Sequence, residues 1–148
     1  MQLEFDIKSV EKIIGYVFND KQLLVSAFTL PSYAHDNGIA SYNRLEHLGD
    51  SILGFCVSRY LFDKFPNENE DFLTEERKKI VAKTPLAETF DRLVLSPYPL
   101  VSKNQLLNEA IKSDIIEALI AAIYLDSRAK KGIDVASNWI IKNAVNSV

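Results

Sequence analysis

Residues 42–65 read YNRLEHLGDSILGFCVSRYLFDKF, and their apolar side chains recur with the period of an α-helix. Leu45, Leu48 and Ile52 stand three and four residues apart, which places them on one helical face. A second apolar stretch, residues 105–125, predicts another long helix of this kind. The 148 residues contain only five glycines and few alternating runs of β-branched residues. The sequence therefore predicts an all-α fold rather than a sheet.

Shorter helices are expected before the first long one. Asp6 and Asp20 each precede an apolar stretch with helical spacing, and both are suitable N-cap residues. Residues 31–41 begin with proline and contain Asn37-Gly38, a pattern typical of a loop.

More short helices are expected on either side of the second long one, which makes about seven helices in all. Residues 66–71 are acidic and predict a surface loop, after which Thr74 is expected to cap a helix. Thr84-Pro85 predicts a further helix with proline at its first position. Gly132 and Asp134 are expected to precede the last helix.

Length and charge limit the classes of protein to which this chain can belong. A length of 148 residues suits a single domain, residues 1–148. With 17 basic and 20 acidic residues, the net charge is −3, which does not favour binding nucleic acid through charge alone. The one cysteine, Cys56, cannot form an internal disulfide, and no apolar stretch is long enough to span a membrane. An intracellular protein, cytoplasmic or nuclear and without a membrane partner, is therefore expected.

Two pairs of acidic residues lie within the two most apolar stretches. Glu46 and Asp50 are four residues apart, and Asp114 and Glu117 are three apart, so each pair shares one face of its helix. This spacing leaves two interpretations open: each pair lies at the solvent edge of its helix, or the pairs converge on one site. Four converging carboxylates would need protons or a hard divalent cation, and the all-oxygen ligand set suits Mg²⁺ or Mn²⁺.

Residues 43–51, NRLEHLGDS, resemble the nine-residue signature of the ribonuclease III family. Residues 113–126, SDIIEALIAAIYLD, resemble the second motif of that family, and the intervening residues 72–87 resemble its middle segment in order and spacing. The resemblance implies a helical endonuclease domain whose two long helices carry the acidic site. It further implies cleavage of double-stranded RNA with Mg²⁺, for which Mn²⁺ is a possible substitute. The expected products carry 5′-phosphate and 3′-hydroxyl ends with short 3′ overhangs.

The resemblance also assigns residues to roles in catalysis. Glu46, Asp50, Asp114 and Glu117 match the four acids of the family that bind metal and carry out catalysis. Asn43 stands at an auxiliary position of the site, where the family usually has an acid or glutamine, and it brings no charge.

A homodimer, paired through the signature helices, is the assembly that the resemblance implies. The expected interface residues are His47, Leu48, Gly49 and Ile52, and Gly49 is expected to let the paired helices approach closely. His47 replaces the aromatic or other bulky apolar side chain usual in the family. Because histidine gains charge between pH 8 and pH 5.5, the sequence predicts a weaker or pH-sensitive dimer.

Candidates for RNA contact are basic residues near the middle segment and the second motif: Arg77, Lys78, Lys79, Lys83 and Lys112. A solvated helix face is the other interpretation of this pattern. The chain has no room for a double-stranded-RNA-binding domain, so such a domain or protein is expected to be supplied separately. A catalytically silent, nuclease-like RNA-binding or ribosomal protein is the alternative function. The four acids argue against it, while Asn43 and His47 leave it open.

Overall fold

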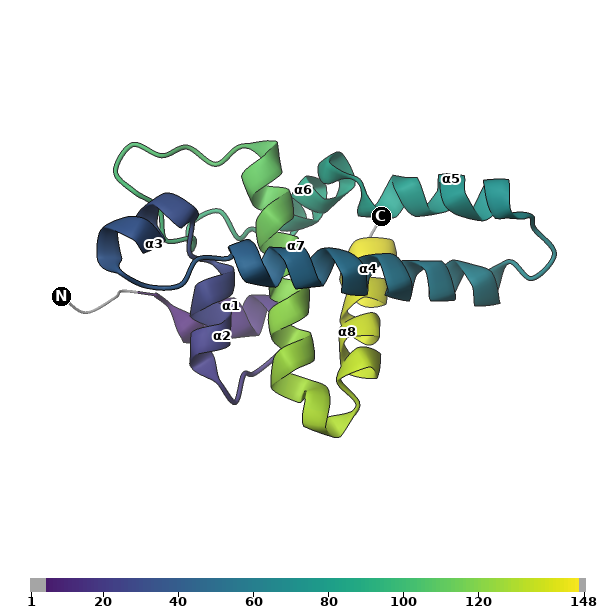
Figure 1. The fold of residues 1–148 in the computed structure, drawn as a ribbon, viewed down its shortest axis with the longest axis horizontal. Coiled ribbons are helices and arrows are strands. Elements are labelled where there is room, and N and C mark those ends of the chain that lie inside the picture. The colour runs from purple at the N-terminus through teal and green to yellow at the C-terminus, as the bar shows by residue number, and fades with distance from the viewer. Residues whose placement is uncertain (1–4, 147–148) are drawn as a thin grey trace.

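The computed structural model describes residues 5–146, and within that range it is built of helices, with no strand (Figure 1). This confirms the predicted all-α class. The described residues form eight α-helices. A 3₁₀ turn at Arg128–Lys130 lies between the last two, and a π-helical turn at Ile141–Val145 follows the last one. None of these helices is both long enough and apolar enough to cross a membrane. The α-helices are α1 (Ile7–Ile14), α2 (Lys21–Ala27), α3 (Pro31–Asn37), α4 (Asn43–Lys64), α5 (Glu70–Val81), α6 (Lys83–Arg92), α7 (Glu109–Ser127) and α8 (Gly132–Ile140).

Helix α7 forms the centre of the core. From Ile115 to Ile123 every apolar side chain of α7 is fully buried, as expected for a helix that is apolar on all sides. Helices α2, α4, α6 and α8 all pack against it, and α4 crosses it (Figure 1). The second half of α4 and the whole of α5, which has no buried residue, project side by side from the rest. The arrangement brings the start of α4 onto the middle of α7.

The N-terminal caps follow the sequence prediction, but the expected loop at residues 31–41 does not. Asp6 and Asp20 accept hydrogen bonds from the backbone N–H groups that open α1 and α2. Residues 31–37 form helix α3 instead of a loop. Pro31 occupies its first turn, where no N–H partner is needed, and Gly38 ends it with a φ of 64°.

Helix α5 begins earlier than expected, because Asn69 and not Thr74 is its N-cap. The Asn69 side chain accepts a hydrogen bond from Phe72 N at 3.0 Å. Glu70 and Asp71 then occupy the first turn, where negative charge favours the helix dipole. The predicted acidic loop therefore contributes its last two residues to the helix.

Three other helix starts also differ from the prediction. Helix α6 begins at Lys83, so Pro85 is its third residue rather than its first. Helix α7 begins at Glu109 rather than residue 105, because the Asn108 side chain caps it by accepting from Ile111 N at 2.9 Å. Helix α8 includes Gly132 from its first position.

A carboxylate near the end of α7 fixes the connection between α1 and α2. Asp126 accepts hydrogen bonds from the Tyr16 hydroxyl at 2.7 Å, from Asn19 N at 2.9 Å and from Asp20 N at 2.7 Å. These bonds hold the N-terminal helices against the end of α7 that lies away from Asp114.

Candidate metal centre

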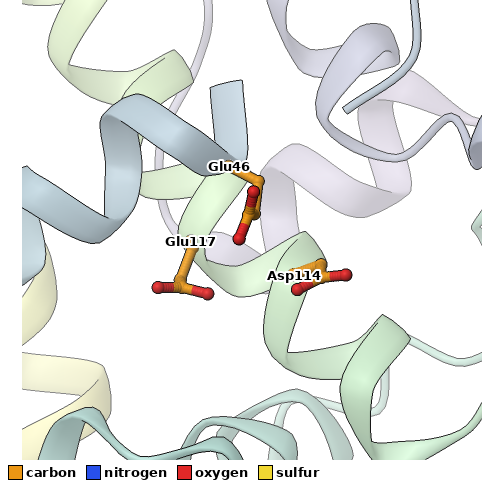
Figure 2. Close-up of side chains that lie close together, drawn as sticks. All are labelled: Glu46, Asp114 and Glu117. Atoms are coloured by element: carbon orange, nitrogen blue, oxygen red, sulfur yellow. The ribbon is translucent and has the colours of Figure 1, made fainter. Parts of the chain in front are cut away.

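Three carboxyl groups meet where α4 crosses α7. Glu46 lies in the first turn of α4, and Asp114 and Glu117 lie one turn apart on α7. One carboxylate oxygen from each residue lies within 4.8 Å of those from the other two. The Glu46 carboxyl points from α4 towards the two carboxyls of α7 (Figure 2). The spacing had left open whether the acids lie at the solvent edges of their helices or converge on one site, and these three converge. We call Glu46, Asp114 and Glu117 the acidic triad.

The fourth predicted acid, Asp50, borders the triad without belonging to it. It is exposed, one turn beyond Glu46 on α4. Its carboxyl forms a hydrogen bond with Glu117, and its charge also acts on Glu46. A role for Asp50 as a metal ligand remains a prediction.

Gly49 makes the close approach of α4 to α7 possible. A β-carbon built on Gly49 would lie 1.7 Å from the backbone oxygen of Glu117, so no side chain fits there. Gly49 is buried by α7 of its own chain. The close contact that requires glycine here is internal to the chain, and a place for Gly49 in a dimer interface remains a prediction. By bringing the two backbones together, Gly49 places Glu46 opposite Glu117.

The remaining predicted interface residues of α4 differ in exposure. Ile52 is only 7% exposed and belongs largely to the core, so it offers little surface to a partner. His47 is exposed and Leu48 is half-buried. Both line a groove of about 790 Å³, together with Asn43, Leu23, Leu125 and neighbouring residues.

Burial raises the pKa values of all three acids of the triad, and repulsion between carboxylates adds to the shift for Glu46 and Glu117. Burial, a hydrogen bond with Asp50 and the surrounding carboxylates raise the pKa of Glu117 to about 8. Burial and the charges of Asp114 and Asp50 also raise the pKa of Glu46. Burial raises the pKa of Asp114, although a hydrogen bond from Tyr42 and the charge of Lys83 oppose the shift. The site therefore favours either a proton or a cation among its oxygens.

We expect the metal-free protein to lose stability as the pH rises from about 4.5, the ordinary pKa of Glu117, to about 8. Over that interval the folded state holds a proton that the unfolded chain has released, so raising the pH favours unfolding. Urea unfolding in EDTA at several pH values measures this dependence. The Glu117→Gln variant should give a flatter profile, and a profile as steep as that of the parent protein would contradict the assignment.

The donor set of the triad fits a hard divalent cation. All of its donors are carboxylate oxygens, the ligand type that suits Mg²⁺ and Mn²⁺. A cation would also offset the repulsion that raises the pKa values of these groups. The acidic triad is therefore able to hold such an ion.

Comparison with known proteins agrees with this arrangement. The sequence profile of the family described as Ribonuclease-III-like matches residues 20–148, which include both helices of the triad. The chain belongs to the ribonuclease III family. The family resemblance of the two motifs is thereby confirmed.

Relatives in this family cover almost the whole chain. Ribonuclease 3 of Clostridium perfringens is 39% identical over 146 residues, which is 95% of this chain and 60% of that protein. Ribonuclease 3 of Clostridium acetobutylicum is 38% identical over 148 residues, which is 96% of this chain and 63% of that protein. The chain thus spans about three-fifths of the length of these family members.

A solved structure in the family has the same fold. The nuclease domain of ribonuclease III from Campylobacter jejuni superimposes with a TM-score of 0.82 at 32% identity. The match covers 93% of this chain and 98% of that domain. That structure was described for its flexibility in a region involved in dimer formation.

Most of the predicted RNA-contacting residues have partners within the chain. Lys78 and Lys79 pair with Glu75 and Glu76 one turn away, and such exposed pairs are weak enough to open for a ligand. Arg77 donates to Ser58 Oγ at 3.1 Å, and Lys112 lies 2.9 Å from Asp91. Lys83 is exposed and acts on Asp114 through its charge. Contact of these residues with RNA remains a prediction.

Sequence reasoning gave no role to Tyr42, whose hydroxyl donates to Asp114 Oδ2 at 3.3 Å. The two residues are 72 positions apart, so no local spacing connects them.

Proposed function

We propose that this chain is an endoribonuclease that hydrolyses phosphodiester bonds in double-stranded RNA with Mg²⁺, for which Mn²⁺ can substitute. The products would have 5′-phosphate and 3′-hydroxyl ends with short 3′ overhangs. The observation that carries the proposal is the acidic triad at the crossing of the two motif helices, because its carboxylates could hold the metal ion that the reaction needs.

Each acid of the site has a role in the proposed binding of the metal ion. Glu46 would bind the cation from α4, and Asp114 and Glu117 would bind it from α7. Glu117 would give up its proton when the cation binds, since the positive charge of the cation favours the ionised carboxylate. Asp50 is exposed and hydrogen-bonded to Glu117, which makes it our candidate for the ligand on the solvent side. The bound cation would supply positive charge that stabilises the phosphoryl transition state and activates water.

We propose that two copies pair through the groove lined by His47 and Leu48. Its lining is largely apolar, with Leu23, Leu45 and Leu125 from three helical segments around these residues. The Campylobacter jejuni nuclease domain, which has a region involved in dimer formation, supports the pairing of two copies by analogy. Sedimentation tests it: we expect a dimer for the parent protein and weaker pairing for His47→Glu, which places a charge in the groove. An unchanged dimerisation constant would contradict the role of His47.

We also propose that residues 1–148 act as the catalytic domain and that RNA is presented by an RNA-binding domain or protein supplied separately. The net charge of −3 supports this, since the domain offers phosphates little overall attraction. The relatives' greater length leaves room for such a domain in those proteins. The biological role that we propose for this activity is RNA processing inside the cell.

Cleavage of a labelled RNA duplex tests the proposed function. At low salt we expect Mg²⁺ to support cutting to short duplexes, EDTA to stop it, and single-stranded RNA of the same sequence to remain intact. The absence of cutting by a well-formed dimer, even with excess enzyme, would instead favour the catalytically silent RNA-binding relative.

A further inference from the structure

Tyr42 connects the acidic triad to the core. It is the residue before α4, it is 4% exposed, and its ring packs within the hydrophobic core. Its hydroxyl donates to Asp114 Oδ2 at 3.3 Å. Its backbone N–H donates to the Thr29 carbonyl oxygen at 2.9 Å, and Thr29 is itself fully buried between α2 and α3. The backbone of Tyr42 is therefore held by Thr29, and its hydroxyl is hydrogen-bonded to Asp114 on α7.

The hydrogen bond from Tyr42 distinguishes Asp114 from its neighbours in the triad. Glu46 and Glu117 face mainly other carboxyl groups, whereas Asp114 also accepts from a neutral phenol. A donor of this kind favours the ionised carboxylate and restricts its rotation. The carboxylate of Asp114 is thus constrained before a cation arrives.

We propose that Tyr42 is a positioning residue that holds the Asp114 carboxylate in the orientation in which it binds the metal ion. This inference rests on the proposed function, since it requires a cation at the triad. Packing of the Tyr42 ring fixes the position of its hydroxyl oxygen next to Asp114. Asp114 therefore loses less freedom when it becomes a ligand, and the site binds metal more tightly.

The Tyr42→Phe substitution tests this role, because it keeps the buried ring and removes only the hydroxyl. We expect the affinity of the RNA-free protein for Mn²⁺, measured by electron paramagnetic resonance of the free ion, to fall about tenfold. The Mg²⁺ concentration for half-maximal cleavage should rise to a similar extent, while the rate at saturating Mg²⁺ stays close to that of the parent protein.

Tyr16→Phe is the matched control. It also removes a hydroxyl that donates to a carboxylate, Asp126, about three helical turns from Asp114 along α7. It should lower thermal stability and leave Mn²⁺ affinity unchanged. If Tyr42→Phe behaves in the same way, the hydroxyl is merely structural and the inference is overturned.

A double-mutant cycle with Asp114→Asn gives a second measurement. If Tyr42 acts through Asp114, Tyr42→Phe should have no further effect on Mn²⁺ affinity in that background. A persisting tenfold loss would overturn the inference. Failure of the proposed metal site itself would look different: the parent protein and Glu117→Gln would then bind Mn²⁺ equally.

Discussion

The Glu117→Gln variant should fold normally and lose RNA cleavage. Glutamine has nearly the same shape as glutamate but cannot supply an anionic ligand, and Glu117 is the most buried of the triad. We expect the cleavage rate in Mg²⁺ to fall by more than about 100-fold, the upper end of the usual loss for a residue that only supports a metal ligand. At pH 8 without metal, the variant should be more stable than the parent protein, because it no longer ionises a buried carboxyl among like charges.

Glu109→Gln provides the matched control for this experiment. Glu109 lies on the same helix, is exposed, and accepts a hydrogen bond from Thr84 outside the triad. Its amide variant should cleave RNA at close to the parental rate. Full activity in Glu117→Gln, or an equal loss in both variants, would contradict the site assignment.

The Gly49→Ala variant should be destabilised by about 3 kcal/mol or more. The added methyl group would overlap the Glu117 carbonyl oxygen, which belongs to the backbone of a core helix and cannot rotate away. Helices α4 and α7 would have to separate. Any folded protein should then also bind Mn²⁺ more weakly, because Glu46 moves away from the two ligands on α7. Urea unfolding and Mn²⁺ binding measure the two effects.

Gly54→Ala makes the same change in the same helix, five residues later. A β-carbon at Gly54 meets no atom within 4 Å, so alanine should be tolerated there. We expect it to stabilise the protein by up to about 1 kcal/mol, since alanine favours the helix more than glycine does. Equal losses of stability in the two variants would show that the α4–α7 contact is not what requires Gly49.

Features that depend on local spacing could be predicted from the sequence. The helical class, the long helix α4 and the caps at Asp6 and Asp20 follow from periodicity and from side chains a few residues apart. The pairing of Asp114 with Glu117 is local in the same sense. Convergence of that pair with Glu46 could be proposed, because acids in such apolar stretches need a partner or an ion.

Features that depend on contacts distant in sequence could not be predicted. The early start of α5 is an exception, because the hydrogen bond from Phe72 N to its Asn69 cap is local and was missed when residues 66–71 were expected to form a loop. Gly49 was expected to face a second copy, because nothing near it in sequence indicates that α7 fills the space. The bond between Tyr42 and Asp114 depends on the same crossing of helices.

A crystal soaked with Mn²⁺ would show directly whether the acidic triad binds a divalent cation. Anomalous diffraction locates the ion independently of any assumed ligands. We predict an anomalous peak within bonding distance of Glu46, Asp114 and Glu117, and its loss in the Glu117→Gln variant. A parent crystal with these carboxylates ordered and no peak between them, at a Mn²⁺ concentration that supports cleavage, would show that the triad is not the metal site.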